Sequence, residues 1–186
     1  MTDGKPTRLS LDRAQLVIVD IQEKLLPFIT DHERVVRQSE RMVRAAAALE
    51  LPMILSEQYP QGLGVTTPLI ADAVEGATHA TKMTFSFCAD ADCREKLVTL
   101  ERPQVLLIGI ETHVCVQQTA LDLLDMGMQP VVLADAVGSR RELDWRVALD
   151  RMRAAGAVVT TVESVIFEMV HASDSELFKR ILPIVK

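Results

Sequence analysis

Three side chains that could together form a nucleophilic catalyst lie in or just after segments that are predicted to be strands. Asp20 ends the run in "VIVDIQ", Lys82 lies in "TKMTFSFCAD", and Cys115 lies in "LLIGIETHVCVQQTALDLL". A thiol can attack an electrophilic carbon, a carboxylate can accept the thiol proton, and a lysine ammonium can keep that carboxylate ionised. If the three side chains meet in space, they form a complete nucleophilic set.

Each of the three residues also has a plainer structural interpretation. Asp20 could cap a helix or pair with a buried Lys or Arg. Lys82 could be a solvated surface charge whose stem is covered by its aromatic neighbours. Cys115 could be a small core residue that faces a sheet. The local sequence around each residue leaves both interpretations open.

The position of Cys115 favours an activated thiol. It is expected at the first turn of a helix that directly follows a strand, where Gly109 permits a sharp turn and Thr112 can cap the helix. A helix amino end carries partial positive charge and unpaired N–H groups, which lower a thiol pKa and can bind an oxyanion. His113 is not expected to act as its base, because helical residues i and i+2 point to different sides.

Six short segments have the composition of β-strands. Near-continuous Val, Ile and Leu in several of them indicates strands that are covered on both faces. The weakest segment, 78–83, is expected at an edge of the sheet. The predicted strands are residues 15–21, 52–58, 78–83, 104–110, 129–135 and 157–163.

Amphipathic segments with helical spacing separate the predicted strands. They cover residues 32–50, 114–126, 141–155 and 174–182, and the second and third are followed by a capping glycine. Strand–helix alternation of this kind predicts an α/β fold, a doubly wound three-layer sandwich with a mostly parallel six-stranded sheet. We expect the 186 residues to form a single domain, residues 1–186.

A doubly wound sheet binds ligands at the carboxyl ends of its strands, where the strand order reverses. The strands ending near Asp20 and Ile110 would be neighbours across that point. The carboxylate of Asp20 is therefore expected within reach of the Cys115 sulfur, and a nearby lysine would hold the carboxylate ionised.

Composition excludes several functional classes. The net charge is −6 and no Lys/Arg block occurs, which argues against binding to nucleic acid or to an anionic membrane. No apolar run approaches the roughly 18 residues that span a bilayer, and the start of the chain does not look like a signal peptide, so a cytoplasmic location is expected. Cys88 and Cys93 have neither disulfide-framework nor zinc-site spacing. No nucleotide-binding motif occurs, and no cofactor is expected.

Five segments together resemble the isochorismatase-like cysteine hydrolases, in the expected order and over nearly the whole chain. They are "LVIVDIQEKLLP", "SEQYPQGLG", "TKMTFSF", "GIETHVCVQQTALDLLDMG" and "VVLADAVGSR". The chain most resembles small isochorismatase-domain proteins of unassigned substrate, and the expected strand order is 3-2-1-4-5-6. The resemblance implies that Asp20, Lys82 and Cys115 form a catalytic triad. Cys115 would attack the substrate, Asp20 would move the proton, Lys82 would keep Asp20 ionised, and water would hydrolyse the resulting thioester.

The same resemblance implies further features of the site. It places a cis peptide bond at Ile110–Glu111, and an oxyanion hole at the backbone N–H groups of Glu111 and Cys115. Weaker candidates for the wall of the substrate pocket are Gln22, Phe85 and Ser86.

Two departures from related enzymes narrow the expected chemistry. Nicotinamidases of this family hold zinc with an Asp and histidines after the second strand, whereas "SEQYPQGLGVTTP" contains no histidine, so we predict no metal and doubt a nicotinamide substrate. True isochorismatases cleave a vinyl ether without needing a cysteine, so Cys115 favours amide or acyl chemistry.

The predicted function is a metal-independent hydrolase of a small-molecule amide or related C–N or acyl bond; the alternative is a catalytically silent binding or scaffold protein. A homo-oligomer, dimer or tetramer, is expected.

Overall fold

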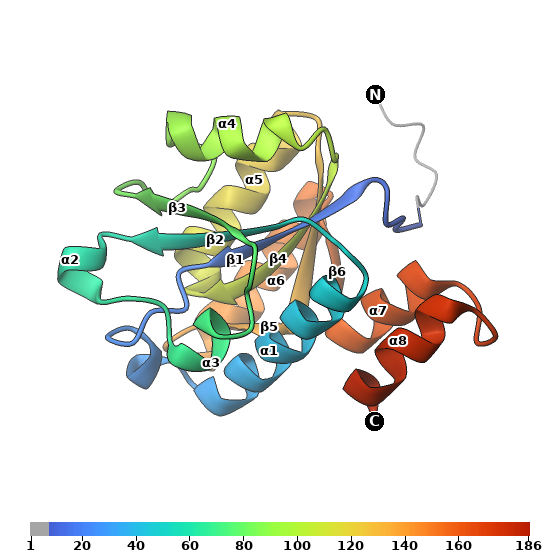
Figure 1. The fold of residues 1–186 in the computed structure, drawn as a ribbon. Helices are drawn as coiled ribbons and strands as arrows, with labels where there is room; N and C mark the ends of the chain where they lie inside the picture. The colour runs from blue at the N-terminus through green and yellow to red at the C-terminus, as the bar shows by residue number, and fades with distance from the viewer. Residues whose placement is uncertain (1–7) are drawn as a thin grey trace.

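The computed structural model, which describes residues 8–186, is built around a six-stranded sheet (Figure 1). All neighbouring strands are parallel, and their order is β3-β2-β1-β4-β5-β6. The predicted fold class and strand order are therefore confirmed. The strands are β1 (Ala14–Val19), β2 (Met53–Gln58), β3 (Thr78–Lys82), β4 (Gln104–Ile110), β5 (Gln129–Gly138) and β6 (Val158–Thr160).

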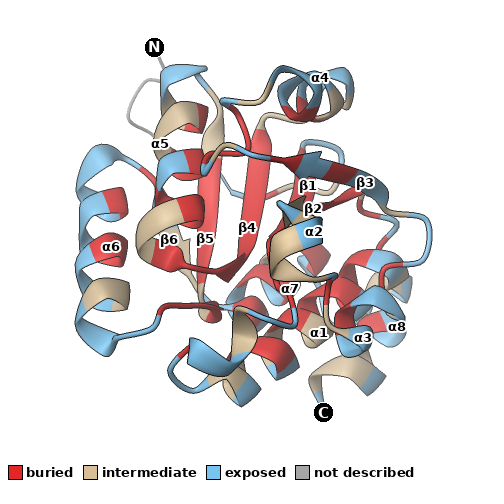
Figure 2. Cartoon of the chain, turned by 90° about the vertical axis from the view of Figure 1, so that its left-hand side faces the viewer, coloured by how far each residue is buried: buried red, intermediate tan, exposed pale blue. Residues whose placement is uncertain are grey.

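Helices cover both faces of this sheet (Figures 1 and 2). On one face lie α1 (His32–Ala48), α3 (Pro68–Ala71), α7 (Val162–Val170) and α8 (Glu176–Val185). On the other lie α4 (Ala91–Thr99), α5 (Gln117–Asp125) and α6 (Glu142–Ala155). The short elements are η1 (Leu26–Phe28), α2 (Pro60–Leu63) and the π-helical turn η2 (Thr112–Val116). No helix in residues 8–186 combines the length and the apolar character needed to cross a bilayer.

The core has two halves, one on each side of the sheet. Every residue of β1 and β4 is buried, and successive side chains alternate between the halves. Leu16 and Ile18 pack under α1 and α7, whereas Val17 and Val19 pack under α5 and α6. This burial on both faces explains why the central strands have almost no polar residues before their carboxyl ends.

Some predicted boundaries were wrong where one element directly follows another. The predicted strand 157–163 ends at Thr160, because Val162 already begins α7. Four helices were not predicted: α4, α7 and the single-turn helices α2 and α3. The last helix continues past the predicted end at residue 182 and includes Pro183.

A close approach of β1 to β4 fixes the geometry at their carboxyl ends. Val19 pairs with Gly109, whose φ is +140°, and a side-chain Cβ placed on Gly109 would lie 2.1 Å from the Val19 carbonyl oxygen. Asp20 and Glu111, which follow these two residues closely, both adopt left-handed conformations with φ near +55° and +56°. The two strands therefore turn away from the sheet side by side, and only glycine fits at position 109.

The predicted cis peptide bond at Ile110–Glu111 is wrong. No peptide bond among residues 8–186 is cis. The chain leaves β4 through the positive φ of Glu111, so the turn into η2 needs no cis bond.

Gly109→Ala is predicted to destabilise the protein by about 3 kcal/mol or more, because the added methyl group overlaps the backbone of β1. Urea unfolding followed by circular dichroism measures the loss. Gly76→Ala is the matched control: its φ is +80°, but nothing lies within 4 Å of the added Cβ, so we expect a loss of only about 1 kcal/mol. Equal losses for the two variants would contradict the close approach.

Candidate active site

A buried ion pair joins the ends of β1 and β3. The Lys82 ammonium lies 2.6 Å from Asp20 Oδ2, and the two side chains are 0% and 1% exposed. Ser56, on the intervening strand β2, donates a hydrogen bond of 2.6 Å to Asp20 Oδ1. Both carboxylate oxygens are therefore bonded, and three adjacent strands contribute to one charged group. The interpretation of Lys82 as a surface charge is wrong.

The chain after β3 completes the surroundings of the Lys82 ammonium. The backbone carbonyls of Thr84 and Phe85 each accept a hydrogen bond of 3.2 Å from Nζ. The side-chain oxygen Oε1 of Gln58 lies 3.4 Å from the same nitrogen. Because an ammonium group can only donate, all of these partners must present oxygens to it.

Cys115 lies beside this ion pair, in the π-helical turn η2. Its thiol donates a hydrogen bond of 3.2 Å to Gln58 Oε1, the oxygen that also faces Lys82. Gln58 therefore links the sulfur to the ion pair. The structure brings the three predicted residues together, although Cys115 is only 4% exposed. The sequence analysis did not single out Gln58; its place at the end of the predicted strand 52–58 was the available signal.

Gln22 fixes the position of Gln58. Its buried side-chain amide accepts a bond of 2.8 Å from the Gln58 N–H and donates one of 3.0 Å to the Gln58 carbonyl. It also donates a bond of 2.6 Å to the carbonyl of Gly64. The polar atoms of Gln22, a predicted pocket residue, are thus used in holding the end of β2 against the loop that follows it.

The other two predicted pocket residues lie on the chain after β3. Phe85 is half-exposed, and its carbonyl holds Lys82. Ser86 is buried; its hydroxyl donates a bond of 2.6 Å to Asp122 Oδ2 and accepts one of 3.1 Å from the Cys88 N–H. Phe85 therefore presents a side chain to solvent beside the ion pair, while Ser86 anchors the segment to α5.

The expected lowering of the Cys115 pKa is wrong. Burial raises the pKa of the Cys115 thiol, and the negative charge of Asp20 raises this pKa further. Lys82 lowers it, but the ammonium is shared with Asp20. Burial is the largest effect on this thiol, and its direction is opposite to the one expected from a helix end.

The remaining cysteines are buried core residues. Burial is the largest effect on both, and it raises the pKa of Cys88 and of Cys93 to about 12. Across residues 8–186, no group of three His, Cys, Asp or Glu side chains gathers in a way that could hold a metal ion.

A second polar group, separate from the thiol, consists of Glu111, His113 and Ser139. The buried Glu111 carboxylate pairs with Arg140 Nε at 2.8 Å and lies 3.6 Å from His113 Nδ1. The same His113 nitrogen lies 3.0 Å from Ser139 Oγ. A Ser–His–acid triad uses both ring nitrogens, one for each partner, so this group cannot relay a proton in that way. His113 contacts Ser139 rather than the thiol.

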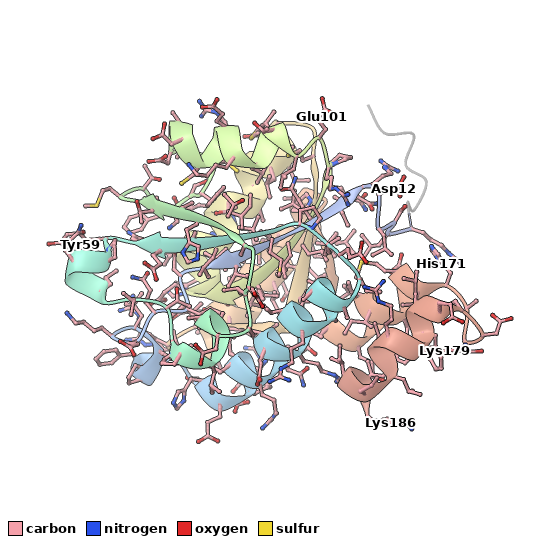
Figure 3. The ribbon with its side chains drawn as sticks, viewed as in Figure 1. Asp12, Tyr59, Glu101, His171, Lys179 and Lys186 are labelled. Carbon is pink, nitrogen blue, oxygen red and sulfur yellow. The ribbon has the colours of Figure 1, made fainter. Side chains whose placement is uncertain are left out.

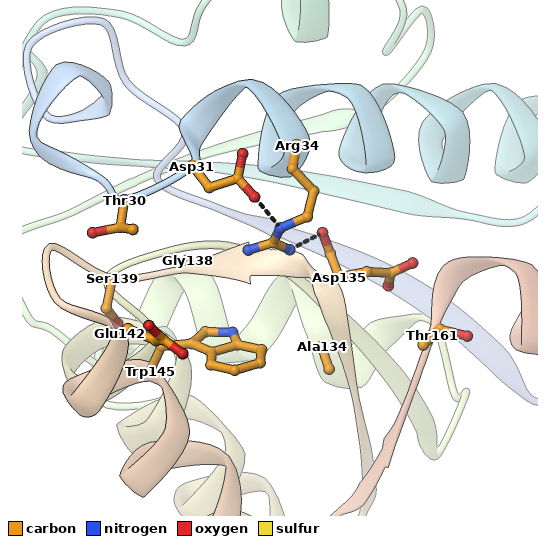
Figure 4. Close-up of a pocket in the computed structure, with 10 residues that line it drawn as sticks. All are labelled: Thr30, Asp31, Arg34, Ala134, Asp135, Gly138, Ser139, Glu142, Trp145 and Thr161. Carbon is orange, nitrogen blue, oxygen red and sulfur yellow. Dashed lines mark hydrogen bonds and ion pairs between the residues drawn. The ribbon is translucent and has the colours of Figure 1, made fainter.

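An open pocket of about 560 Å³ lies next to this group, between α1, β5 and α6 (Figure 4). Arg34 and Trp145 face one another across it, with the guanidinium carbon 6.0 Å from the ring centroid, and Arg34 is bonded to Asp31 at 2.8 Å. Ser139 also lines it, but none of the three triad candidates does. The side chains that line this pocket include no cysteine and no lysine.

The chain matches the family model described as the isochorismatase domain over residues 14–164. It is 39% identical to isochorismatase domain-containing protein 2A of Mus musculus over 183 residues, which is 96% of this chain and 85% of the relative.

Among solved structures, it is similar to one described as the MAR1 ribonuclease of Caenorhabditis elegans, with a TM-score of 0.91, 36% identity, and 96% and 92% of the two chains covered. It also resembles YcaC of Pseudomonas aeruginosa, solved with covalent acrylamide (TM-score 0.90, 25% identity, 97% and 92% covered). YcaC of Escherichia coli, described as an octameric hydrolase of unknown specificity, is similar too (TM-score 0.89, 25% identity, 96% and 93% covered).

Lys82→Met is predicted to destabilise the protein by about 3–5 kcal/mol, because it leaves the Asp20 charge buried and unpaired. The double variant Asp20→Asn/Lys82→Met removes both charges and should recover part of that loss. Urea unfolding of both single variants and the double variant measures the coupling. Losses that simply add would contradict a coupled buried pair.

The rate of Cys115 alkylation by iodoacetamide is predicted to keep rising through pH 10, because the raised thiol pKa leaves little thiolate at lower pH. Asp20→Asn should lower that pKa and accelerate alkylation at pH 8, whereas Lys82→Met should raise the pKa and slow the reaction. Peptide mass spectrometry distinguishes Cys115 from the other cysteines. A plateau below pH 8 in the unmodified protein would show that the thiolate is already formed.

Proposed function

Because this chain belongs to the isochorismatase family, we propose that it is a cysteine hydrolase that cleaves a small amide or related acyl compound without a metal. The observation that carries the proposal is the buried Asp20–Lys82 pair, joined to the Cys115 thiol through Gln58. A nucleophile, a base and a group that keeps the base charged are then in one place.

The first step is attack by a sulfur that loses its proton only as the new bond forms. The S–H proton passes to the Asp20 carboxylate while sulfur bonds to the carbonyl carbon and the carbonyl π electrons move to oxygen. Lys82 keeps the carboxylate ionised until this moment, and its fixed contacts mean that no water must reorganise. A thiol with a raised pKa suits this sequence, because it keeps its proton until the new bond begins to form.

The backbone N–H groups of Glu111 and Cys115 are the proposed donors to the oxyanion. The Val114 N–H is already used, since it donates a bond of 2.8 Å to the Glu111 carbonyl. The positive φ of Glu111 turns the chain at this point, directly before η2. Collapse of the tetrahedral adduct breaks the C–N bond, and the proton held by Asp20 moves to the leaving nitrogen.

Water completes the reaction. Asp20, again a carboxylate, accepts a proton from the water that attacks the thioester carbon. The C–S bond then breaks, the acid is released, and the sulfur recovers the proton from Asp20. The same carboxylate serves both halves of the cycle because it lies next to the sulfur throughout.

The related structures support parts of this proposal. The Pseudomonas aeruginosa YcaC structure contains covalent acrylamide, an electrophile that carries a primary amide. The Escherichia coli YcaC is an octamer, which is why we also propose that the present chain forms a homo-oligomer. A catalytically silent binding protein is the second candidate, favoured only by the 4% exposure of Cys115.

Cys115→Ala is predicted to abolish both acrylamide labelling and hydrolysis of any substrate found in a panel of small amides and carbamoyl compounds, a loss of at least about 10³-fold. Intact-protein mass spectrometry reads the adduct, and product release reads turnover. Cys88→Ala is the matched control, since it also truncates a buried cysteine but should keep both activities. An unmodified Cys115 after prolonged exposure to acrylamide would favour the silent binding protein.

A further inference from the structure

The charged side chains around the thiol are mainly acidic. Lys82 adds no net positive charge, because it is neutralised by Asp20 at 2.6 Å. Glu23 and Glu111 follow β1 and β4, and Glu57 lies on β2. The other lysine on these segments, Lys24, is exposed and donates to the Gly62 carbonyl at 3.0 Å.

Glu57 keeps its negative charge without a cation. It is half-buried on β2, next to Gln58, and its Oε1 accepts bonds of 2.6 and 2.8 Å from the backbone N–H and the hydroxyl of Thr66. No Lys, Arg or His within residues 8–186 forms an ion pair with it. This carboxylate is therefore held by neutral donors alone.

Glu111 contributes a second acidic side chain, which is paired with an exposed arginine. Its side chain is 8% exposed, whereas that of its partner Arg140 is 59% exposed, so water screens the guanidinium more than the carboxylate. Its Oε2 is buried and accepts no hydrogen bond. Glu111 lies in the turn that leads to Cys115, and its charge raises the pKa of that thiol.

The rim of the same site is apolar. The loops after β2 and β3 expose Tyr59, Val65, Met83 and Phe85. The Tyr59 N–H donates a bond of 3.0 Å to the Lys82 carbonyl, which joins the two loops directly. These apolar side chains therefore lie on the loops that follow the Gln58 and Lys82 ends of β2 and β3.

We infer that the site accepts uncharged acyl compounds with an apolar substituent and excludes substrates that carry a carboxylate or a phosphate. Anions of both kinds are normally bound by Arg or Lys, often bidentately by Arg, and the two positive groups near this thiol are already paired with Asp20 and Glu111. The inference rests on the proposed function, because it concerns the substrate of the same thiol.

The charged side chains around the thiol also affect whether RNA could bind at this site. The related Caenorhabditis elegans structure is described as a ribonuclease. An RNA backbone would bring several phosphates to the rim, and binding it requires lysine and arginine side chains that the segments around the thiol do not offer freely. Cleavage of RNA at this thiol is therefore disfavoured by the same inference.

Two reagents of nearly equal shape test the charge selectivity. Iodoacetamide is neutral and iodoacetate is anionic, and both alkylate thiols. The rate ratio at Cys115 is measured by peptide mass spectrometry at pH 8.5 and divided by the ratio for a short unstructured cysteine peptide. We expect the normalised ratio, taken as the iodoacetamide rate divided by the iodoacetate rate, to be about ten or more.

Two substitutions that change the local charge in opposite directions make the test specific. Glu111→Gln keeps the side-chain shape but removes the charge, and should move the normalised ratio toward one. Arg140→Gln removes the partner of Glu111, and should increase the ratio. Glu101→Gln is the control: it makes the same chemical change before β4, far from Tyr59 at the rim (Figure 3), and should leave the ratio unchanged.

The possible outcomes separate the two proposals. A normalised ratio near one, or ratios that do not respond to Glu111→Gln and Arg140→Gln, would overturn the charge selectivity and leave the nucleophile in place. No alkylation of Cys115 by either reagent would remove the nucleophile, and with it both proposals. A high ratio that falls with Glu111→Gln and rises with Arg140→Gln supports the inference.

Discussion

The buried ion pair between Asp20 and Lys82 is the interaction on which the site depends. Removing two charges from water is costly, and their attraction offsets the cost only when geometry and additional hydrogen bonds are good. Here the pair is 2.6 Å long, Ser56 bonds the second carboxylate oxygen, and two backbone carbonyls bond the ammonium. These partners come from the ends of β1, β2 and β3 and from the chain after β3. The pair therefore fixes the relative positions of three strand ends.

The state of the thiol follows from the same burial. The pKa of a partially exposed cysteine at a helix N-terminus is usually lowered, which favours the thiolate. Cys115 is instead desolvated beside a carboxylate, so the pKa of its thiol rises and its proton stays near Gln58 and Asp20. Reactivity then depends on a base that acts at the moment of attack. This arrangement needs no histidine, and His113 is directed to Ser139.

Close packing of the central strands brings these groups together. Gly109 lets the carbonyl of Val19 approach the backbone of β4, and left-handed turns at Asp20 and Glu111 follow directly. The side chain of Gln22 then holds the end of β2. Each of these features acts on backbone position, and their joint result is that side chains distant in sequence meet at one edge of the sheet.

The sequence by itself determined the strands, their order through the family resemblance, and the identity of the three residues at the strand ends. These features are local: runs of Val, Ile and Leu, capping glycines, and polar residues directly after apolar ones. Only the tertiary structure decided the role of Gln58, the raised pKa of Cys115 and the trans bond at Ile110–Glu111. The physical reason is that desolvation and hydrogen-bond partners depend on neighbours that are remote in sequence, and a spacing pattern carries no information about which atoms exclude water from a thiol.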